Sequence, residues 1–222
     1  MILLKKLEIF TKLHTQTKRD YIKRMIEEKV NCMKTAKKYG FDFWDGERKF
    51  GYGGYKYDGR QEYIARELIK EYNLSDNSKI LDVGCGKGFL IYEFKKLLPN
   101  CEVFGFDVSE YAIKNAKEEI KEKLFVHNAK DKFPFEDKQF DMVVSITTLH
   151  NLELFELEQS IKEIERVGKQ KYIVVESYRN EQELFNLQCW ALTCASFFTP
   201  KTWDYIFNRC DYTGDYEFIY FQ

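Results

Sequence analysis

The octapeptide LDVGCGKG, residues 81–88, constrains the fold of this chain more than any other stretch. It begins within the apolar run KILDV, which is typical of a buried strand, and it precedes an amphipathic run at 89–98 that predicts a helix. Gly84, Gly86 and Gly88 allow close approach of the backbone to a ligand, and the helix start offers unpaired N–H groups. The pattern is one residue tighter than the dinucleotide-binding fingerprint, so by itself it indicates only a ligand-binding or structural turn.

The rest of the chain alternates between strand and helix patterns. Further strands are expected at 102–106, 124–127, 141–146, 172–176 and, in YEFIYFQ, at 216–222, with helices at 110–122, about 156–167 and 200–210. This alternation predicts an α/β fold with a doubly wound, mostly parallel sheet and helices on both faces. The short connection before the last strand favours an antiparallel edge pairing.

The first sixty residues precede this pattern. Apolar residues at helical spacing predict a helix from about residue 21, with Gly40 as its stop. We expect residues 1–60 to form an N-terminal helical cap and a tyrosine- and glycine-rich lid, and residues 61–222 to form the α/β domain. The decapeptide GYGGYKYDGR, residues 51–60, combines flexible glycines with aromatic faces, which suits a lid over a small site. The alternative is a surface connector with solvated charges.

The composition excludes several classes of partner. Lys and Arg number 35 against 36 Asp and Glu, so no general attraction to nucleic acid or anionic lipid exists. The six cysteines show no metal-binding spacing, and neither the broken N-terminal apolar run nor residues 189–198 suits a signal peptide or a membrane span. We therefore expect a cytoplasmic protein with no metal, nucleic-acid or membrane partner. The aromatic-rich residues 41–44 predict packing on the domain or a homodimer interface.

Two aspartates beside the glycine turn indicate the chemistry of its ligand. Asp107 lies 19 residues after Gly88, at the end of the second strand, where a carboxylate can accept hydrogen bonds from both hydroxyls of a ribose. Asp82 precedes the turn, and a negative charge there suits a cationic ligand group better than a pyrophosphate.

These motifs, followed by GFDVSEYAIKNAK at 105–117 and FVHNAKDKFPFEDKQFDMVVSI at 125–146, resemble class I S-adenosylmethionine-dependent methyltransferases of the small-molecule, ubiquinone-biosynthesis-like type. The resemblance begins at about residue 79. It implies S-adenosyl-L-methionine as cofactor and a Rossmann-like, seven-stranded sheet whose C-terminal strand is antiparallel. The cofactor-binding residues that it implies are Asp82, Gly84, Cys85, Gly86, Gly88, Asp107, Val108, Asn128, Ala129 and Ile146. Asn128 replaces the family's usual aspartate, and its carbonyl can still accept from an adenine amino group.

Methyl transfer from a sulfonium is an in-line displacement that requires alignment and an unprotonated acceptor, without a metal. His150, just past the fourth strand, is a candidate general base, and the alternative is that it caps or packs the next helix. Tyr52 and Tyr55 are further catalytic candidates from the lid. The candidate acceptor-binding residues are Lys56, Tyr57, Arg60 and Trp190, with Arg48 as a further cation. Core packing is the alternative for Trp190, and the hydroxyls of Ser145, Thr147 and Thr148 are expected to bond to the local backbone.

The leading hypothesis for the acceptor is a small, anionic metabolite that is methylated on oxygen. The chain lacks a recognition domain, and SITTLHNL stands where amino-group methyltransferases of nucleobases and glutamine carry Asn-Pro-Pro-Tyr. The lysine- and aromatic-rich composition suggests a sugar, phosphate or phosphoramidate intermediate of cell-surface polysaccharide synthesis. The alternatives are an RNA methyltransferase and a catalytically silent cofactor-binding or interaction module.

Overall fold

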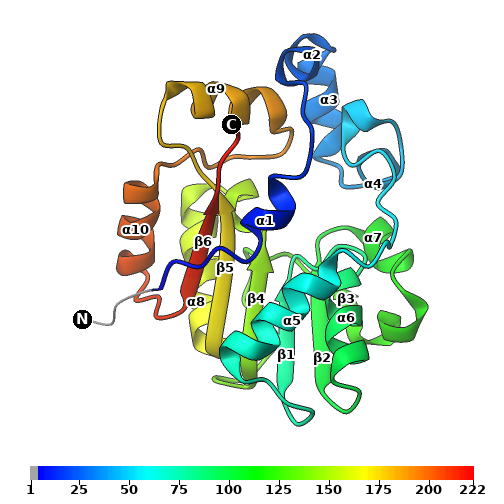
Figure 1. The fold of residues 1–222 in the computed structure, drawn as a ribbon, viewed down its shortest axis with the longest axis vertical. Helices are drawn as coiled ribbons and strands as arrows, with labels where there is room; N and C mark the ends of the chain where they lie inside the picture. Colours follow the sequence, from blue (N-terminus) through cyan, green and yellow to red (C-terminus); the bar gives the residue numbers. More distant parts are fainter. Residues whose placement is uncertain (1–4) are drawn as a thin grey trace.

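A computed structural model describes residues 5–222. At its centre lies a six-stranded sheet in the order β3-β2-β1-β4-β5-β6, with every neighbouring pair parallel (Figure 1). The strands are β1 (Lys79–Val83), β2 (Glu102–Asp107), β3 (Leu124–Val126), β4 (Phe140–Ile146), β5 (Gly168–Glu176) and β6 (Asp215–Ile219). The order reverses between β1 and β4, which creates the switch point at which open α/β sheets bind ligands.

Helices cover both faces of the sheet (Figure 1). One face carries α5 (Gln61–Tyr72), α6 (Phe89–Leu97), α7 (Glu110–Lys114) and the 3₁₀ helix η2 (Glu118–Lys123), and the other carries α8 (Leu154–Val167) and α10 (Pro200–Arg209). Alternate strand residues enter the two cores, so that Ile80 packs on the first face and Leu81 on the second. The α/β class, the parallel sheet and the helices on both faces are thus confirmed.

The expected seventh strand and the antiparallel C-terminal strand are wrong. β6 pairs with β5 in parallel, with Tyr172 opposite Asp215 and Glu176 opposite Ile219. Between these two strands the chain passes through α9 (Glu181–Trp190) and α10, and this long connection returns it to the amino end of the sheet, as a parallel pairing requires. The short link before β6 is therefore the last part of a crossover and not a hairpin turn.

The N-terminal region consists of several short helices. They are α1 (Thr11–His14), α2 (Tyr21–Ile26), α3 (Lys29–Ala36), α4 (Phe41–Trp44) and the 3₁₀ turn η1 (Arg48–Phe50). The single helix expected from residue 21 to Gly40 is interrupted at Glu28, whose φ of 48° lies in the left-handed region and ends the helical run. Helices α2, α3 and α4 lie beyond the carboxyl ends of the strands, at the top of Figure 1.

Residues 5–11 attach to the last strand. Lys6 forms a parallel bridge with Tyr216. The carboxylate of Glu217 accepts the backbone N–H groups of Ile9 at 2.7 Å and of Phe10 at 2.9 Å, beside the start of α1. Leu7 and Ile9 belong to the same hydrophobic core as α5 and α6, so this part of the predicted cap packs with the α/β domain.

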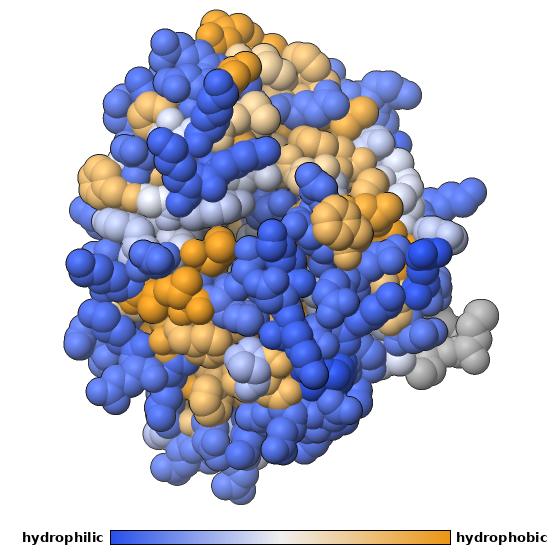
Figure 2. All heavy atoms as spheres, turned by 180° about the vertical axis from the view of Figure 1, so that it is seen from behind, coloured by the Kyte–Doolittle hydropathy of each residue, from blue (hydrophilic) through white to orange (hydrophobic). Residues whose placement is uncertain are grey.

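The rear face of the molecule is mainly hydrophilic, with apolar areas interrupted by charged side chains (Figure 2). Within residues 5–222, no helix combines the length and apolarity needed to cross a membrane. The possible homodimer stays a prediction.

Candidate active site

β1 ends in a turn of left-handed glycines. Gly84, Gly86 and Gly88 have φ angles of 82°, 56° and 72°. A Cβ atom at Gly84 would lie 2.1 Å from Oγ1 of Thr148, and one at Gly86 would lie 2.9 Å from the ring of Trp44. Both the backbone angles and the lack of space therefore require glycine in this turn.

Two buried carboxylates lie beside the turn. Asp107 accepts the N–H of Gly86 at 2.9 Å through Oδ2 and the N–H of Ser109 at 2.8 Å through Oδ1, which fixes the carboxylate and leaves a lone pair on each oxygen. Asp82 is only 4% exposed, and burial together with the charge of Asp107 raises its pKa to about 8. Burial also raises the pKa of Asp107. Within residues 5–222 neither carboxylate has a basic side chain within 4 Å, and Lys87 of the turn pairs with Asp45 instead.

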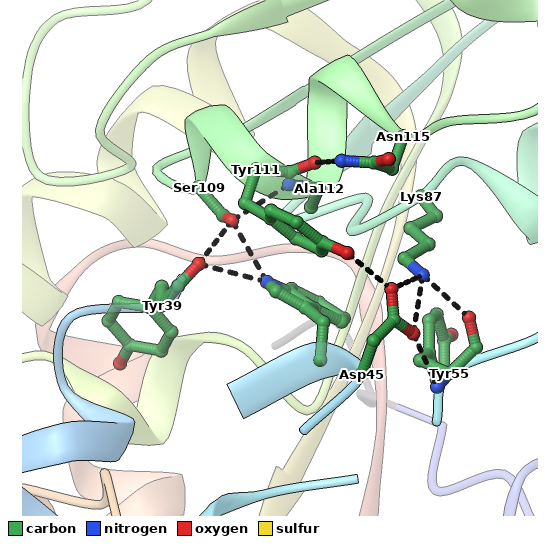
Figure 3. Close-up of polar contacts among 9 residues, drawn as sticks. Tyr39, Asp45, Tyr55, Lys87, Ser109, Tyr111, Ala112 and Asn115 are labelled. Carbon is green, nitrogen blue, oxygen red and sulfur yellow. Dashed lines mark hydrogen bonds and ion pairs between the residues drawn. The ribbon is translucent and has the colours of Figure 1, made fainter. Parts of the chain in front are cut away.

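Lys87 and Asp45 join the N-terminal region to the turn (Figure 3). Nζ of Lys87 donates to the two oxygens of Asp45 at 2.8 and 2.6 Å and to the carbonyl oxygen of Tyr55 at 2.9 Å. The hydroxyl of Tyr111, on α7, donates to the same carboxylate at 2.7 Å. Because Lys87 is 6% exposed, water and salt screen this pair weakly. We call Lys87, Asp45 and Tyr111 the latch.

Aromatic rings form a second attachment over the turn. Nε1 of Trp44 donates to Oγ of Ser109 at 2.8 Å, and the indole ring stacks on Tyr52 with 5.3 Å between centroids and 9° between planes. Tyr55 stacks on Phe89, at the start of α6, with a centroid distance of 4.9 Å. Stacked pairs of this kind add to the burial energy of the rings, so the segment is held on the turn from two sides.

His150 and Glu176 meet at the carboxyl ends of β4 and β5. Nε2 of His150 lies 3.4 Å from Oε2 of Glu176, and the two side chains are 5% and 14% exposed. Burial lowers the pKa of His150 to about 3 and raises the pKa of Glu176 to about 7. Near neutral pH the imidazole is therefore neutral. Nδ1 of His150 is buried and has no hydrogen-bond partner among residues 5–222.

The exit of β4 is strained. Thr147 has a φ of 54°, which is rare for a β-branched residue and is typical of functional sites when it occurs. The hydroxyl of Ser145 donates to the carbonyl oxygen of Val83 at 3.0 Å, and the hydroxyl of Thr148 donates to the carbonyl oxygen of Gly84 at 3.4 Å. For Ser145 and Thr148 the expected bonding to the backbone is thus confirmed.

The other expected cofactor-binding residues lie around the ends of β1 to β4. Cys85 and Ala129 are each 7% exposed, Ile146 is partly buried, and Val108 is 44% exposed. The side-chain oxygen of Asn128 accepts the N–H of Lys130 at 3.2 Å.

Three of the expected acceptor-binding residues interact with other groups than His150 and Glu176, or with solvent. The hydroxyl of Tyr57 donates to Glu93 at 2.7 Å, Lys56 is exposed, and Arg60 forms an exposed ion pair with Asp58.

The two tyrosines expected to be catalytic keep their protons. Burial, with the charges of Glu176 and Asp107 added, raises the pKa of Tyr52 to about 12, and burial raises the pKa of Tyr55 further. Phenols with such pKa values donate hydrogen bonds near neutral pH and do not accept a proton from an alcohol.

Sequence reasoning missed Glu176 and the latch. Glu176 is the last residue of the expected strand at 172–176, so the end-of-strand position that revealed Asp107 is a signal that also applies to it. Asp45 and Lys87 are 42 residues apart and show no local pattern.

The glycine turn and its carboxylates lie at the switch point of an α/β sheet, where they suit a ligand with cationic and hydroxyl groups. Residues 74–210 match the family described as "Methyltransferase domain", which is more than half of the chain, and the chain belongs to this family.

Known proteins share this region at low identity. The chain is 26% identical over 136 residues to the mitochondrial arginine-hydroxylase NDUFAF5 of Mus musculus, covering 60% of this chain and 39% of that protein. It is 31% identical over 105 residues to demethylmenaquinone methyltransferase of Chlorobaculum tepidum, covering 47% and 42%. The match thus spans about two fifths of these relatives. The YcgJ protein of Bacillus subtilis has a similar fold, with a TM-score of 0.54, 19% identity and 66% of each chain covered. The MccD protein has a TM-score of 0.52, with 23% identity and 67% and 69% covered.

Proposed function

We propose that this enzyme transfers the methyl group of S-adenosylmethionine to a hydroxyl oxygen of a small, anionic acceptor. The observation that carries the proposal is the buried His150–Glu176 pair. β4, which leads to His150, is the direct neighbour of β1, which leads to the glycine turn. Adjacent strands lie about 5 Å apart, so the pair is within reach of a methyl group held over the turn.

The residues beside the turn fit the cofactor. S-adenosylmethionine carries an ammonium group, a ribose and a sulfonium that supplies the methyl group. Asp82 and Asp107 are buried carboxyl groups without a basic partner within 4 Å in the described chain, so they suit a cation, whose charge would favour the ionised form of Asp82. Asp107 would accept from the ribose hydroxyls through its remaining lone pairs, and Asn128 and Ala129 would face the adenine.

His150 would receive the proton of the acceptor. Oε2 of Glu176 lies 3.4 Å from Nε2 of His150, so an ionised Glu176 would favour the tautomer with the proton on Nε2 and leave the Nδ1 lone pair for a hydroxyl hydrogen. Burial disfavours the imidazolium that forms, and an ionised Glu176 beside it compensates for this, as a carboxylate does for histidine in other enzymes. Tyr52 and Tyr55, which stay protonated, would enclose the reacting groups and donate hydrogen bonds.

The small size of the proposed acceptor agrees with the segment over the turn, which the latch and the aromatic rings hold close to the cofactor residues. The net charge of -1 gives no support to an RNA substrate. A sugar, phosphate or phosphoramidate intermediate of cell-surface polysaccharide synthesis remains the proposed pathway context.

Turnover tests the proposal directly. The purified enzyme with S-adenosylmethionine is offered a panel of sugar phosphates, nucleotide sugars and small hydroxy acids, and the release of S-adenosylhomocysteine is followed. We expect turnover with at least one phosphorylated metabolite and an O-methyl signal in the NMR spectrum of the product. Methylation of RNA alone would contradict the proposal, and so would tight cofactor binding without turnover on any acceptor.

Variants of the pair test the mechanism. His150→Gln and Glu176→Gln should each lower kcat about 100-fold, the usual contribution of a general base, with unchanged affinity for S-adenosylhomocysteine. Because the pKa of Glu176 is about 7, wild-type kcat should rise with pH through that value as the carboxylate ionises. The control is Glu62→Gln, which removes an exposed carboxylate of α5. Full kcat in His150→Gln at every pH would remove the residue as a base.

A further inference from the structure

Three arginines surround the indole ring of Trp190 at the end of α9. The guanidinium carbons of Arg19, Arg24 and Arg48 lie 5.4, 5.0 and 4.9 Å from the centre of the ring. They come from the segment before α2, from α2 and from η1, so three separate parts of the N-terminal region converge on one side chain. We call Trp190 and these three residues the arginine cluster.

The cluster lacks carboxylate partners. The chain has eight arginines, and five of them form an ion pair with a carboxylate within 4 Å, namely Arg60, Arg66, Arg166, Arg179 and Arg209. Across residues 5–222, the three that form no such pair are the three of the cluster. Burial, with the charge of Arg48 added, lowers the pKa of Arg24 to about 10, and both factors also lower the pKa of Arg19. Like charges are thus held together without a carboxylate within 4 Å in the described part of the chain.

The hydrogen bonds of the cluster leave donors unused. Arg24, which is 8% exposed, donates to the carbonyl oxygens of Trp190 at 3.5 Å and of Arg48. Nη1 of Arg19 donates to the carbonyl oxygens of His14 at 3.2 Å and Thr17 at 3.0 Å, and Nη2 lies 3.1 Å from Nδ1 of His14. Nη1 of Arg48 donates to the carbonyl oxygen of Gly51. Nε of Arg19 is buried and has no partner within residues 5–222. The carboxyl end of α9 offsets part of the charge through its partial negative charge. Arg48 is exposed, so a solute reaches the cluster from solvent.

The chain that follows Trp190 contacts His150, since the N–H groups of Ala195 and Ser196 each donate to the carbonyl oxygen of His150 at 3.0 Å. Burial lowers the pKa of Arg19 and raises the pKa of Glu176. The positive charge of Arg19 partly reverses the shift of Glu176, and the negative charge of Glu176 partly reverses the shift of Arg19, as expected of neighbouring groups. Glu176 in turn lies 3.4 Å from His150. β5, which ends at Glu176, is two strands from β1. A ligand with one end at the cluster therefore extends toward the exit of β4, where the proposed base lies.

We propose that the arginine cluster binds the anionic group of the methyl acceptor, and that this group is a phosphate ester. The inference rests on the proposed function, because it places the charged end of the acceptor beside the proposed base. Guanidinium forks bind phosphate oxygens in pairs, and a dianion balances three cations better than a single carboxylate does. The ring of Trp190 fixes the guanidinium planes by stacking before the ligand arrives.

Phosphate binding to the cofactor-loaded enzyme tests the inference. Inorganic phosphate is titrated into the full chain saturated with S-adenosylhomocysteine, and heat and tryptophan fluorescence are recorded. We expect saturable binding that weakens at least about tenfold in Arg19→Gln and Arg48→Gln, with Arg48→Lys intermediate because it keeps the charge and loses the fork. Arg66→Gln, which removes an exposed arginine of α5, is the matched control and should bind as the wild type does.

Parallel measurements separate the possible failures. Acetate is titrated in a second series, and acetate binding as tight as phosphate binding would overturn the phosphate assignment. If the wild type binds S-adenosylhomocysteine but shows no saturable phosphate binding, the arginine cluster is not a phosphate site. Unchanged phosphate affinity in the arginine variants would overturn the proposal in the same way. Wild type that fails to bind S-adenosylhomocysteine overturns the proposed function instead. Far-UV circular dichroism checks the fold of each variant, and if a Gln variant unfolds, Arg48→Lys and the wild-type titration decide.

Discussion

The two sides of the site carry opposite charges that the described chain leaves unpaired. Beside β1 and β2, Asp82 and Asp107 have no basic side chain within 4 Å among residues 5–222. Beside β5 and α9, the arginine cluster has no carboxylate in the same range. Elsewhere among residues 5–222, Lys171 pairs with Glu165 at 2.9 Å, and the buried carboxylate of Glu217 is compensated by backbone N–H groups. Buried charge without compensation destabilises a fold, so these two unpaired groups of side chains point to a cationic ligand on one side and an anionic ligand on the other.

Among the substitutions that test the two sides of the site, removal of the Asp107 carboxylate should have the largest effect on ligand binding. Asp107→Ala should weaken binding of S-adenosylhomocysteine by about 1.5 to 3 kcal/mol, because charge-assisted hydrogen bonds to the ribose are lost. Isothermal titration calorimetry measures this, and Asp76→Ala, in an exposed loop, serves as the control. Unchanged affinity would refute the ribose role and leave the carboxylate as a support for the backbone of Gly86 and Ser109.

Replacement of Asp82 by a neutral residue should change cofactor affinity and folding stability in opposite directions. The pKa of Asp82 is raised to about 8 by burial and by Asp107, so the folded protein binds this proton more tightly than the unfolded chain does. Its contribution to stability is present below pH 4 and is lost as the pH rises through about 8. Asp82→Asn should therefore raise the free energy of unfolding of the cofactor-free protein at pH 9 by about 2 kcal/mol, with little gain at pH 5.

Urea unfolding at the two pH values gives this difference, and titration with S-adenosylmethionine should show an affinity about tenfold lower in Asp82→Asn. If the variant and the wild type lose stability in parallel between pH 5 and pH 9, Asp82 is not the titrating group.

Opening the latch should have the smallest effect. Lys87→Met removes the cation that joins Asp45 and the Tyr55 carbonyl to the turn. We expect S-adenosylhomocysteine to dissociate several-fold faster and the amides of residues 52–55 to exchange hydrogen faster, because the segment then keeps only the aromatic contacts and the hydrogen bonds of Trp44 and Tyr111. Stopped-flow release and hydrogen exchange measure both, with the exposed Lys114→Met as control. Unchanged rates would mean that the latch supports only the fold.

The sequence predicted those features of the fold that local residue patterns determine. Strand periodicity, the glycine turn and the end-of-strand position of Asp107 identified the core of the fold and the cofactor side of the site. The direction of β6 depends on the crossover through α9 and α10, and the break in the helix at Glu28 depends on a single backbone angle. The spacing of apolar residues along the sequence indicates neither feature. The sequence named Trp190 and Arg48 as acceptor-binding candidates but missed Arg19 and Arg24, because the members of the arginine cluster come from four segments that only the tertiary fold brings together.

The attachment of residues 5–11 to β6 also orders events during synthesis of the chain. The N–H of Leu7 donates to the carbonyl oxygen of Tyr216 at 3.0 Å, and Glu217 accepts the N–H groups at the start of α1. A ribosome makes these partners about two hundred residues later, so Leu7 and Ile9, which are 7% and 8% exposed in the folded protein, stay in water until residues 215–219 emerge. A nascent chain stalled before β6 thus leaves Leu7 and Ile9 without their partners, and exposed apolar side chains of this kind are what chaperones bind.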